Sequence, residues 1–93
     1  MNKSLFYLVE DLIDPDESFK NINISGIKID SNKVLPGDLF IAVPGENFDG
    51  HDFVNQAIKN GASAIVTNGR SMNLDPTPQI KVANPRKAVS HLS

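Results

Sequence analysis

The sequence predicts an α/β fold: a small mixed sheet that contains a βαβ unit and has helices on its flanks. Two short apolar runs, Leu39 to Val43 and Ala64 to Thr67, predict buried strands. Proline-glycine pairs bracket the first run, as is typical of a strand between two turns. Between the runs, His51 to Asn60 carries apolar residues at helical spacing. Because parallel strands need a connection that crosses the sheet, this order predicts the βαβ unit.

The residues before the central strand predict one helix and two short extended segments. Apolar residues at helical spacing predict a helix over Ser4 to Leu12, with Ser4 as its N-cap. Isoleucines from Asn21 to Asp30 predict two strands that are separated by a bend at Ser25-Gly26. Pro36-Gly37 then predicts the turn that leads into the central strand.

The residues after the βαβ unit predict a loop, a strand and a final helix. Residues 68–78 are polar and contain two prolines, which indicates a surface loop. Gln79 to Val82 predicts a further strand, and Asn84-Pro85 predicts the N-cap and first residue of a helix. The sequence stops inside this helix without a C-cap, so we expect a fragment of a longer protein.

Composition excludes several classes of function. Ninety-three residues are enough for one small domain. Nine basic and eleven acidic residues, with no basic cluster longer than Arg86-Lys87, argue against a nucleic-acid surface. There is no cysteine for a disulfide or a thiolate metal site, and no run approaches the ~20 apolar residues of a membrane span. We expect a cytoplasmic protein that binds neither nucleic acid nor membrane.

Polar residues follow the predicted strands, and they are the candidate binding residues. Asp30-Ser31 offers a carboxylate and a hydroxyl, although a turn in which both side chains bond to local backbone is the commoner arrangement. The loop at residues 46–48 offers polar contacts and an apolar wall, or is an ordinary surface loop. Asp49-Gly50 begins a helix, where unpaired N–H groups attract anions such as phosphate, and an aspartate in this position is more often part of a helix start than a catalytic acid.

The sequence contains no complete catalytic or metal site. His51 and His91 are far apart and lack supporting ligands, so we expect each to be a surface histidine. There is no Ser/His/Asp arrangement, no carboxylate pair with a defined spacing and no G-x-x-x-x-G-K-[ST] loop. By themselves, the residues predict a small α/β module with an anion-binding loop.

Four segments together resemble the amino-terminal part of the Mur ligases. Three are GIKIDS from Gly26, VLPGDLFIA from Val34 and PGENFDGHDF from Pro44. The fourth, NPRKA from Asn84, resembles the Asp-Pro-Arg-x-Ala segment of the members that add the third residue, usually meso-diaminopimelate or lysine, to UDP-N-acetylmuramoyl-L-alanyl-D-glutamate. Two alternatives stay open: the D-alanyl-D-alanine-adding member, whose first domain is similar, and a stand-alone nucleotide-sugar-binding or interaction module.

The resemblance implies a UDP-sugar-binding domain over residues 1–83. Residues 84–93 would then begin a helix that leads to a central ATPase domain missing from this chain. By position, the substrate contacts are Ile29, Ser31, Glu46, Asn47 and Phe48. The start of the helix at Asp49 and Gly50 is expected to face the diphosphate.

The resemblance also implies that the chemistry lies outside this chain. In the complete enzyme, ATP and magnesium convert the substrate carboxylate to an acyl phosphate, which the incoming amine attacks. No catalytic residue, metal or cofactor is expected in this fragment, which would contact the missing central domain and orient the substrate. One residue departs from the family pattern: Asn32 stands where an arginine is common, so the contacts of that arginine are not implied here.

Overall fold

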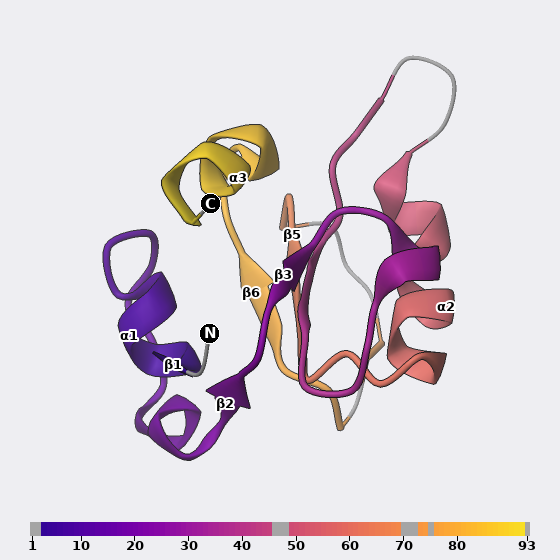
Figure 1. Ribbon diagram of the computed structural model, residues 1–93. Helices are drawn as coiled ribbons and strands as arrows, with labels where there is room; N and C mark the ends of the chain where they lie inside the picture. The colour runs from indigo at the N-terminus through magenta and orange to yellow at the C-terminus, as the bar shows by residue number, and fades with distance from the viewer. Residues whose placement is uncertain (1–2, 46–48, 70–72, 75, 93) are drawn as a thin grey trace.

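The computed structural model describes residues 3–45, 49–69, 73–74 and 76–92. A four-stranded sheet lies at its centre, with all strands parallel and in the order β3-β4-β5-β6 (Figure 1). A separate antiparallel pair is formed by β1 and β2. The strands are β1 (Lys3–Ser4), β2 (Asn23–Ile24), β3 (Ile27–Lys28), β4 (Leu39–Ile41), β5 (Ala64–Thr67) and β6 (Gln79–Lys81).

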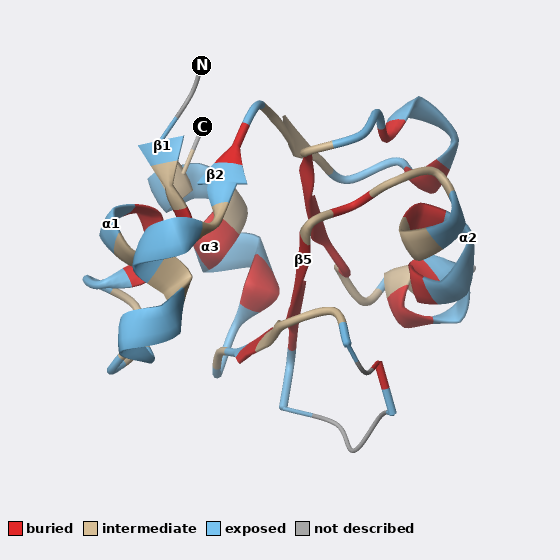
Figure 2. Ribbon diagram, turned by 90° about the horizontal axis from the view of Figure 1, so that it is seen from below, coloured by how far each residue is buried: buried red, intermediate tan, exposed pale blue. Residues whose placement is uncertain are grey.

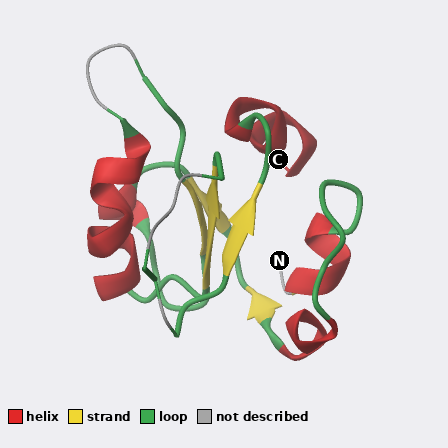
Figure 3. Ribbon diagram, turned by 180° about the vertical axis from the view of Figure 1, so that it is seen from behind, coloured by secondary structure: helices red, strands yellow, loops and turns green. Residues whose placement is uncertain are grey.

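Helices cover both faces of the central sheet. Seen from behind, α2 lies on one side of the strands, and α1 and α3 lie on the other (Figure 3). Short 3-10 helices occupy three of the connections. The helical elements are α1 (Leu5–Val9), η1 (Glu17–Asn21), η2 (Ser31–Lys33), η3 (Gly50–Phe53), α2 (Val54–Lys59) and α3 (Pro85–Leu92). Among the described residues, these helices lack the length and apolarity needed to cross a membrane.

The predicted α/β class, the βαβ unit and the flanking helices are confirmed. The unit runs from β4 through η3 and α2 to β5. The central sheet is wholly parallel rather than mixed, because each of its connections returns the chain to the same end of the sheet. The antiparallel strand pair β1–β2 lies outside this sheet, since the chain bends at Ser25-Gly26 and passes from that pair into the central sheet. An isolated antiparallel bridge also joins Pro44 to Asp49.

Successive residues of β4 pack into two different cores. Leu39 and Ile41 contact the residues of α1 and α3, whereas Phe40 contacts those of α2. All three side chains are fully buried. The neighbouring strand β5 is also buried along its length (Figure 2). This is the alternation expected of an extended chain, and helices on both faces explain why the strand is apolar throughout.

Two local predictions for the first helix need correction. The regular α-helix ends at Val9 instead of Leu12, although the N–H groups of Leu12 and Ile13 still donate to the Val9 carbonyl. Ser4 stands at the N-cap position, but its side chain does not cap the helix. Its hydroxyl donates instead to the carbonyls of Phe19 and Lys20, 3.1 Å away in each case. Ser4 therefore joins α1 to η1.

The predicted turn before β4 and the predicted start of the last helix are confirmed. Gly37 adopts a φ of 92° in the predicted turn, a conformation that glycine tolerates without strain. The Asn84 side chain accepts a hydrogen bond from the N–H of Arg86 at 3.1 Å, and Pro85 is the first residue of α3. Ala88, in the next turn of this helix, is buried against the sheet.

Candidate functional site

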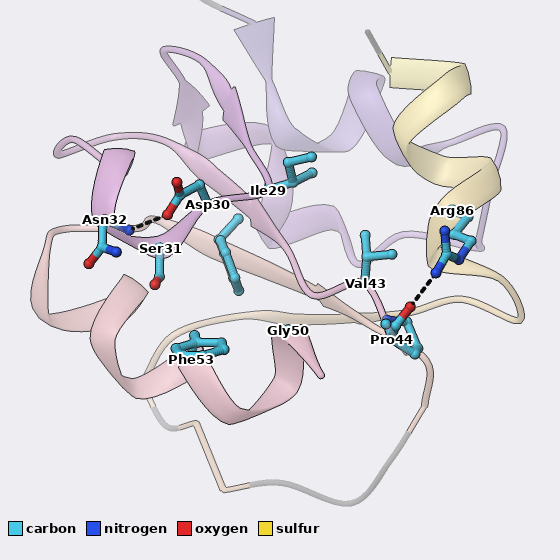
Figure 4. Close-up of a pocket in the computed structure, with 11 residues that line it drawn as sticks. Ile29, Asp30, Ser31, Asn32, Val43, Pro44, Gly50, Phe53 and Arg86 are labelled. Carbon is cyan, nitrogen blue, oxygen red and sulfur yellow. Dashed lines mark hydrogen bonds between the residues drawn. The ribbon is translucent and has the colours of Figure 1, made fainter. Parts of the chain in front are cut away.

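A pocket of about 480 Å³ lies where β3 and β4 end (Figure 4). Ligands of open parallel sheets bind at this edge, and the volume is in the range of small-molecule sites. Residues from five parts of the chain line it: those that follow β3, β4 itself, those that follow β4, η3 and the first turn of α3. They are Ile29, Asp30, Ser31, Asn32, Phe40, Val43, Pro44, Gly45, Gly50, Phe53 and Arg86.

Apolar side chains form the middle of this pocket. Phe40 belongs to the core and is fully buried, so its position is fixed by packing. Ile29 and Phe53 are large apolar residues, and their exposed fractions are 59% and 39%. Because both border the same pocket, their exposed surface provides apolar walls for a ligand instead of an isolated surface patch.

The residues after β3 form a polar end of the pocket. An oxygen of the Asp30 carboxylate accepts from the N–H of Asn32 at 3.0 Å and so caps η2. Ser31 is 5% exposed, and its carbonyl accepts from the Asn60 side chain at 2.8 Å. Its hydroxyl lines the pocket and has no hydrogen-bond partner among the described residues. The local-turn role therefore belongs to Asp30, whereas the Ser31 hydroxyl remains accessible to a ligand.

Arg86 lies at the other end of the pocket and was not among the predicted site residues. Its Nη2 donates to the Pro44 carbonyl at 2.7 Å, so the first turn of α3 is tied to the chain that follows β4. In the sequence this arginine stood in a basic pair beside a helix start and in the NPRKA segment of the family resemblance, and neither feature predicted a place in the binding site. Its place in the pocket depends on how α3 packs across the sheet.

The N–H groups at the start of η3 already have acceptors. The Gly50 N–H donates to the Val43 carbonyl at 2.9 Å. The N–H groups of His51 and Asp52 donate to the side chain and the carbonyl of Asp49, both at 2.9 Å. The predicted contact of this helix start with a diphosphate would therefore require at least one of these donors to exchange its acceptor.

His51 is buried, so the prediction of a surface histidine is wrong for this residue. Its side chain is 1% exposed and lies between two polar partners. Nδ1 is 2.6 Å from an Asp49 carboxylate oxygen, and Nε2 is 3.1 Å from the backbone N of Asn68. Since a backbone N–H can only donate, Nε2 accepts and Nδ1 carries the proton toward Asp49. His91, by contrast, is exposed as predicted.

The predicted site residues fall into three groups. Ile29, Ser31 and Gly50 line the pocket, whereas Asp49 caps η3 beside it. Glu46, Asn47 and Phe48 lie outside the described residues, and their contacts stay a prediction. The pocket residues missed from the sequence include Val43, Phe53 and Arg86. Val43 ends an apolar run and Phe53 begins the apolar stripe of a predicted helix, so their sequence patterns could not distinguish a pocket wall from core.

A family profile described as "Mur ligase family, catalytic domain" matches residues 23–93. The chain belongs to the Mur ligase family. A UDP-N-acetylmuramoyl-L-alanyl-D-glutamate–2,6-diaminopimelate ligase from Bacillus velezensis is 38% identical over 93 residues, which is 100% of this chain and 18% of the relative. A UDP-N-acetylmuramyl-tripeptide synthetase from Borreliella afzelii is 46% identical over 66 residues, 71% of this chain and 13% of that protein.

Solved Mur ligase structures share the fold of this Mur ligase chain. One is UDP-N-acetylmuramoylalanyl-D-glutamyl-2,6-diaminopimelate–D-alanyl-D-alanyl ligase from Acinetobacter baumannii. It superimposes with a TM-score of 0.71 at 28% sequence identity, over 99% of this chain and 21% of its own. This Mur ligase chain therefore spans about a fifth or less of the length of these relatives.

Proposed function

We propose that this Mur ligase chain binds the UDP end of UDP-N-acetylmuramoyl-L-alanyl-D-glutamate. It would do so within an ATP-dependent ligase that adds the third residue of the peptidoglycan stem peptide. The observation that supports this proposal most directly is the pocket at the ends of β3 and β4. It contains Ile29 and Ser31, the two strand-end residues that the family resemblance predicts as UDP contacts.

The chemistry of the pocket suits a nucleoside. The exposed faces of Ile29 and Phe53 offer apolar walls against which a planar ring can pack. Ser31 and Asn32 offer a hydroxyl and an amide, which can both donate to and accept from the edge of a uracil. A mostly apolar cavity with a few polar groups at one end is the usual form of a small-molecule site.

The proposed role of this chain is to hold and orient substrate, so it carries no proposed chemical step. ATP and magnesium do not fit its residues: the sequence lacks a phosphate-binding G-x-x-x-x-G-K-[ST] loop, and the described residues contain no group of three side chains suited to a metal ion. Formation and aminolysis of the acyl phosphate belong, in this proposal, to other parts of the ligase. A cytoplasmic setting fits the absence of cysteine.

A second candidate is the same domain of the ligase that adds D-alanyl-D-alanine, which the similarity to the Acinetobacter baumannii structure favours. The complete gene product, incubated with ATP and magnesium, distinguishes the two. The first proposal predicts that it extends UDP-N-acetylmuramoyl-L-alanyl-D-glutamate with diaminopimelate or lysine. The second predicts that it extends the UDP-linked tripeptide with D-alanyl-D-alanine. If neither combination of substrates gave a product, both ligase proposals would be contradicted, and a stand-alone binding module would be favoured.

The site itself is tested by titrating the complete gene product with UDP in a calorimeter. Ser31→Ala removes the pocket hydroxyl, and we expect UDP affinity to fall about two- to tenfold, the net value of one hydrogen bond. Asn47→Ala tests the loop prediction in the same way. Ser90→Ala is the matched control, because Ser90 is exposed on α3 and lies outside the pocket. Unchanged affinity in both Ser31→Ala and Asn47→Ala would remove these residues from the site.

A further inference from the structure

The two ends of the pocket differ in charge. Asp30, Ser31 and Asn32 form the end beside η2, where the acidic group already accepts from a backbone N–H. Arg86 lies at the opposite end, beside Pro44 (Figure 4). Among the described residues that line the pocket, Arg86 carries the positive charge. A ligand with a neutral polar ring and an anionic tail therefore fits in one orientation, with the tail toward α3.

The geometry of Arg86 leaves it able to bind an anion. A guanidinium has five N–H donors in a planar fork. Among the described residues, one hydrogen bond is made by this group, from Nη2 to the Pro44 carbonyl at 2.7 Å. That bond holds the guanidinium at the pocket wall and so reduces the conformational entropy lost when a ligand binds. The remaining N–H donors suit a phosphate group, because arginine often donates two parallel hydrogen bonds to two phosphate oxygens.

The start of η3 is a weaker candidate for the same role. Its N–H groups at Gly50, His51 and Asp52 already donate within the chain. A phosphate there would displace an existing hydrogen bond, whereas a phosphate at Arg86 would use donors that the described residues leave available.

We propose that Arg86 recognises the negative charge of the ligand: its guanidinium binds the phosphate groups of a nucleoside diphosphate whose base lies against Ile29, Ser31 and Phe53. This inference rests on the proposed function and adds a specificity-determining residue to it. Arg86 sets the preference for a nucleoside diphosphate over the uncharged nucleoside. The bond to Pro44 is then a means of positioning the guanidinium.

The competing explanation is that Arg86 is only a structural link between α3 and the chain after β4. Arg86→Gln separates the two roles, because its amide can still donate to the Pro44 carbonyl but carries no charge. The experiment titrates the complete gene product with UDP and with uridine. In the unaltered protein we expect UDP to bind more tightly than uridine. In Arg86→Gln we expect UDP affinity to fall about tenfold or more while uridine affinity stays unchanged, as for loss of a charge-assisted hydrogen bond.

Two further variants sharpen the test. Lys87→Gln removes the neighbouring charge of α3, which lies outside the pocket, and should leave both affinities unchanged. Arg86→Lys keeps the charge without the planar fork, so its preference for UDP should fall between those of the unaltered protein and Arg86→Gln. Thermal unfolding of each variant verifies that the fold is retained.

Specific outcomes would overturn the inference. Equal losses of UDP and uridine affinity in Arg86→Gln would indicate a structural link. A loss in Lys87→Gln as large as that in Arg86→Gln would indicate general electrostatics, and a fall in Arg86→Lys as large as in Arg86→Gln would contradict charge recognition. In all three cases the unaltered protein still binds UDP, and the proposed function stands. If the unaltered protein binds no UDP, the proposed function and this inference both fail.

Discussion

The buried side chain of His51 connects a segment beside the pocket to the sheet. His51 donates from Nδ1 to Asp49, which caps η3 beside the pocket, and accepts at Nε2 from the N–H of Asn68 just after β5. Both partners are polar groups that would lose a hydrogen bond if the ring were removed. The residue therefore acts as a positioning group for the chain segment between β4 and α2.

Substitutions of His51 should separate its two hydrogen bonds. His51→Ala removes both and leaves a cavity, so we expect the free energy of unfolding to fall by about 2–4 kcal/mol. His51→Gln can still accept from Asn68 and His51→Asn can still donate to Asp49, so each should lose about half as much. Urea unfolding of the three variants provides the measurement.

The second histidine is the matched control for this series. His91 is exposed and lies 3.6 Å from an exposed Asp11 carboxylate, a contact of the kind that contributes little. His91→Ala should change stability by less than about 0.5 kcal/mol. A His51→Ala variant as stable as His91→Ala would show that the buried network does not hold this segment.

At the scale of elements, the connection from β4 to α2 depends on a close approach of two backbones. Gly50 begins η3 and donates to the carbonyl of Val43, which lies just after β4. A Cβ at Gly50 would lie 2.6 Å from the Val43 nitrogen and 2.9 Å from its carbonyl oxygen. The predicted helix from His51 therefore starts as a 3-10 turn pressed against the strand, and a glycine is needed there for space.

Gly50→Ala should consequently destabilise the protein and distort the pocket. Because backbone atoms must move to relieve the clash, we expect a loss of about 2–3 kcal/mol and weaker UDP binding. Gly69→Ala is the comparison: Gly69 has a φ of 91°, but a Cβ there would meet nothing within 4 Å. In Gly69→Ala the strained backbone conformation alone should lower the free energy of unfolding by about 1 kcal/mol, and UDP affinity should not change. Equal losses of stability in the two variants would argue against the close-approach explanation.

At the scale of the whole molecule, one strand supports both the core and the pocket. Phe40 and Ile41 are adjacent in β4 and fully buried, but they face opposite layers. Phe40 also forms part of the pocket wall, whereas Ile41 does not. In a domain of this size the core is small, so the packing of the α2 layer also determines the shape of the pocket.

A pair of conservative substitutions tests this coupling. Phe40→Leu and Ile41→Val should each lower the free energy of unfolding by about 1 kcal/mol through lost packing. Only Phe40→Leu should also weaken UDP binding, by a few-fold, because it enlarges the pocket beneath the ligand. Calorimetric titration of both variants, together with their urea unfolding, gives the comparison. A similar loss of affinity in Ile41→Val would indicate that binding follows overall stability.

The sequence alone determined the features that depend on near neighbours in the chain. Short apolar runs and turn residues placed β4 and β5, helical spacing placed α2 between them, and Asn84 marked the start of α3. Ser31 was a candidate from the residues themselves because it follows a predicted strand, whereas Ile29 was added by the family resemblance. These signals are local, since a strand, a cap or a turn is set by residues within a few positions.

The tertiary structure decided the features that depend on which distant segments meet. Arg86 is held at the pocket by a hydrogen bond to the carbonyl of Pro44, which is 42 residues away in the sequence. The buried His51 accepts a hydrogen bond from the N–H of Asn68, 17 residues away. The parallel order of the sheet and the exposure of Phe53 at a pocket wall likewise follow from packing between elements. The local sequence shows whether a residue is polar or apolar. Whether that residue is buried, and which groups it contacts, depends on the distant segments that pack against it in the folded chain.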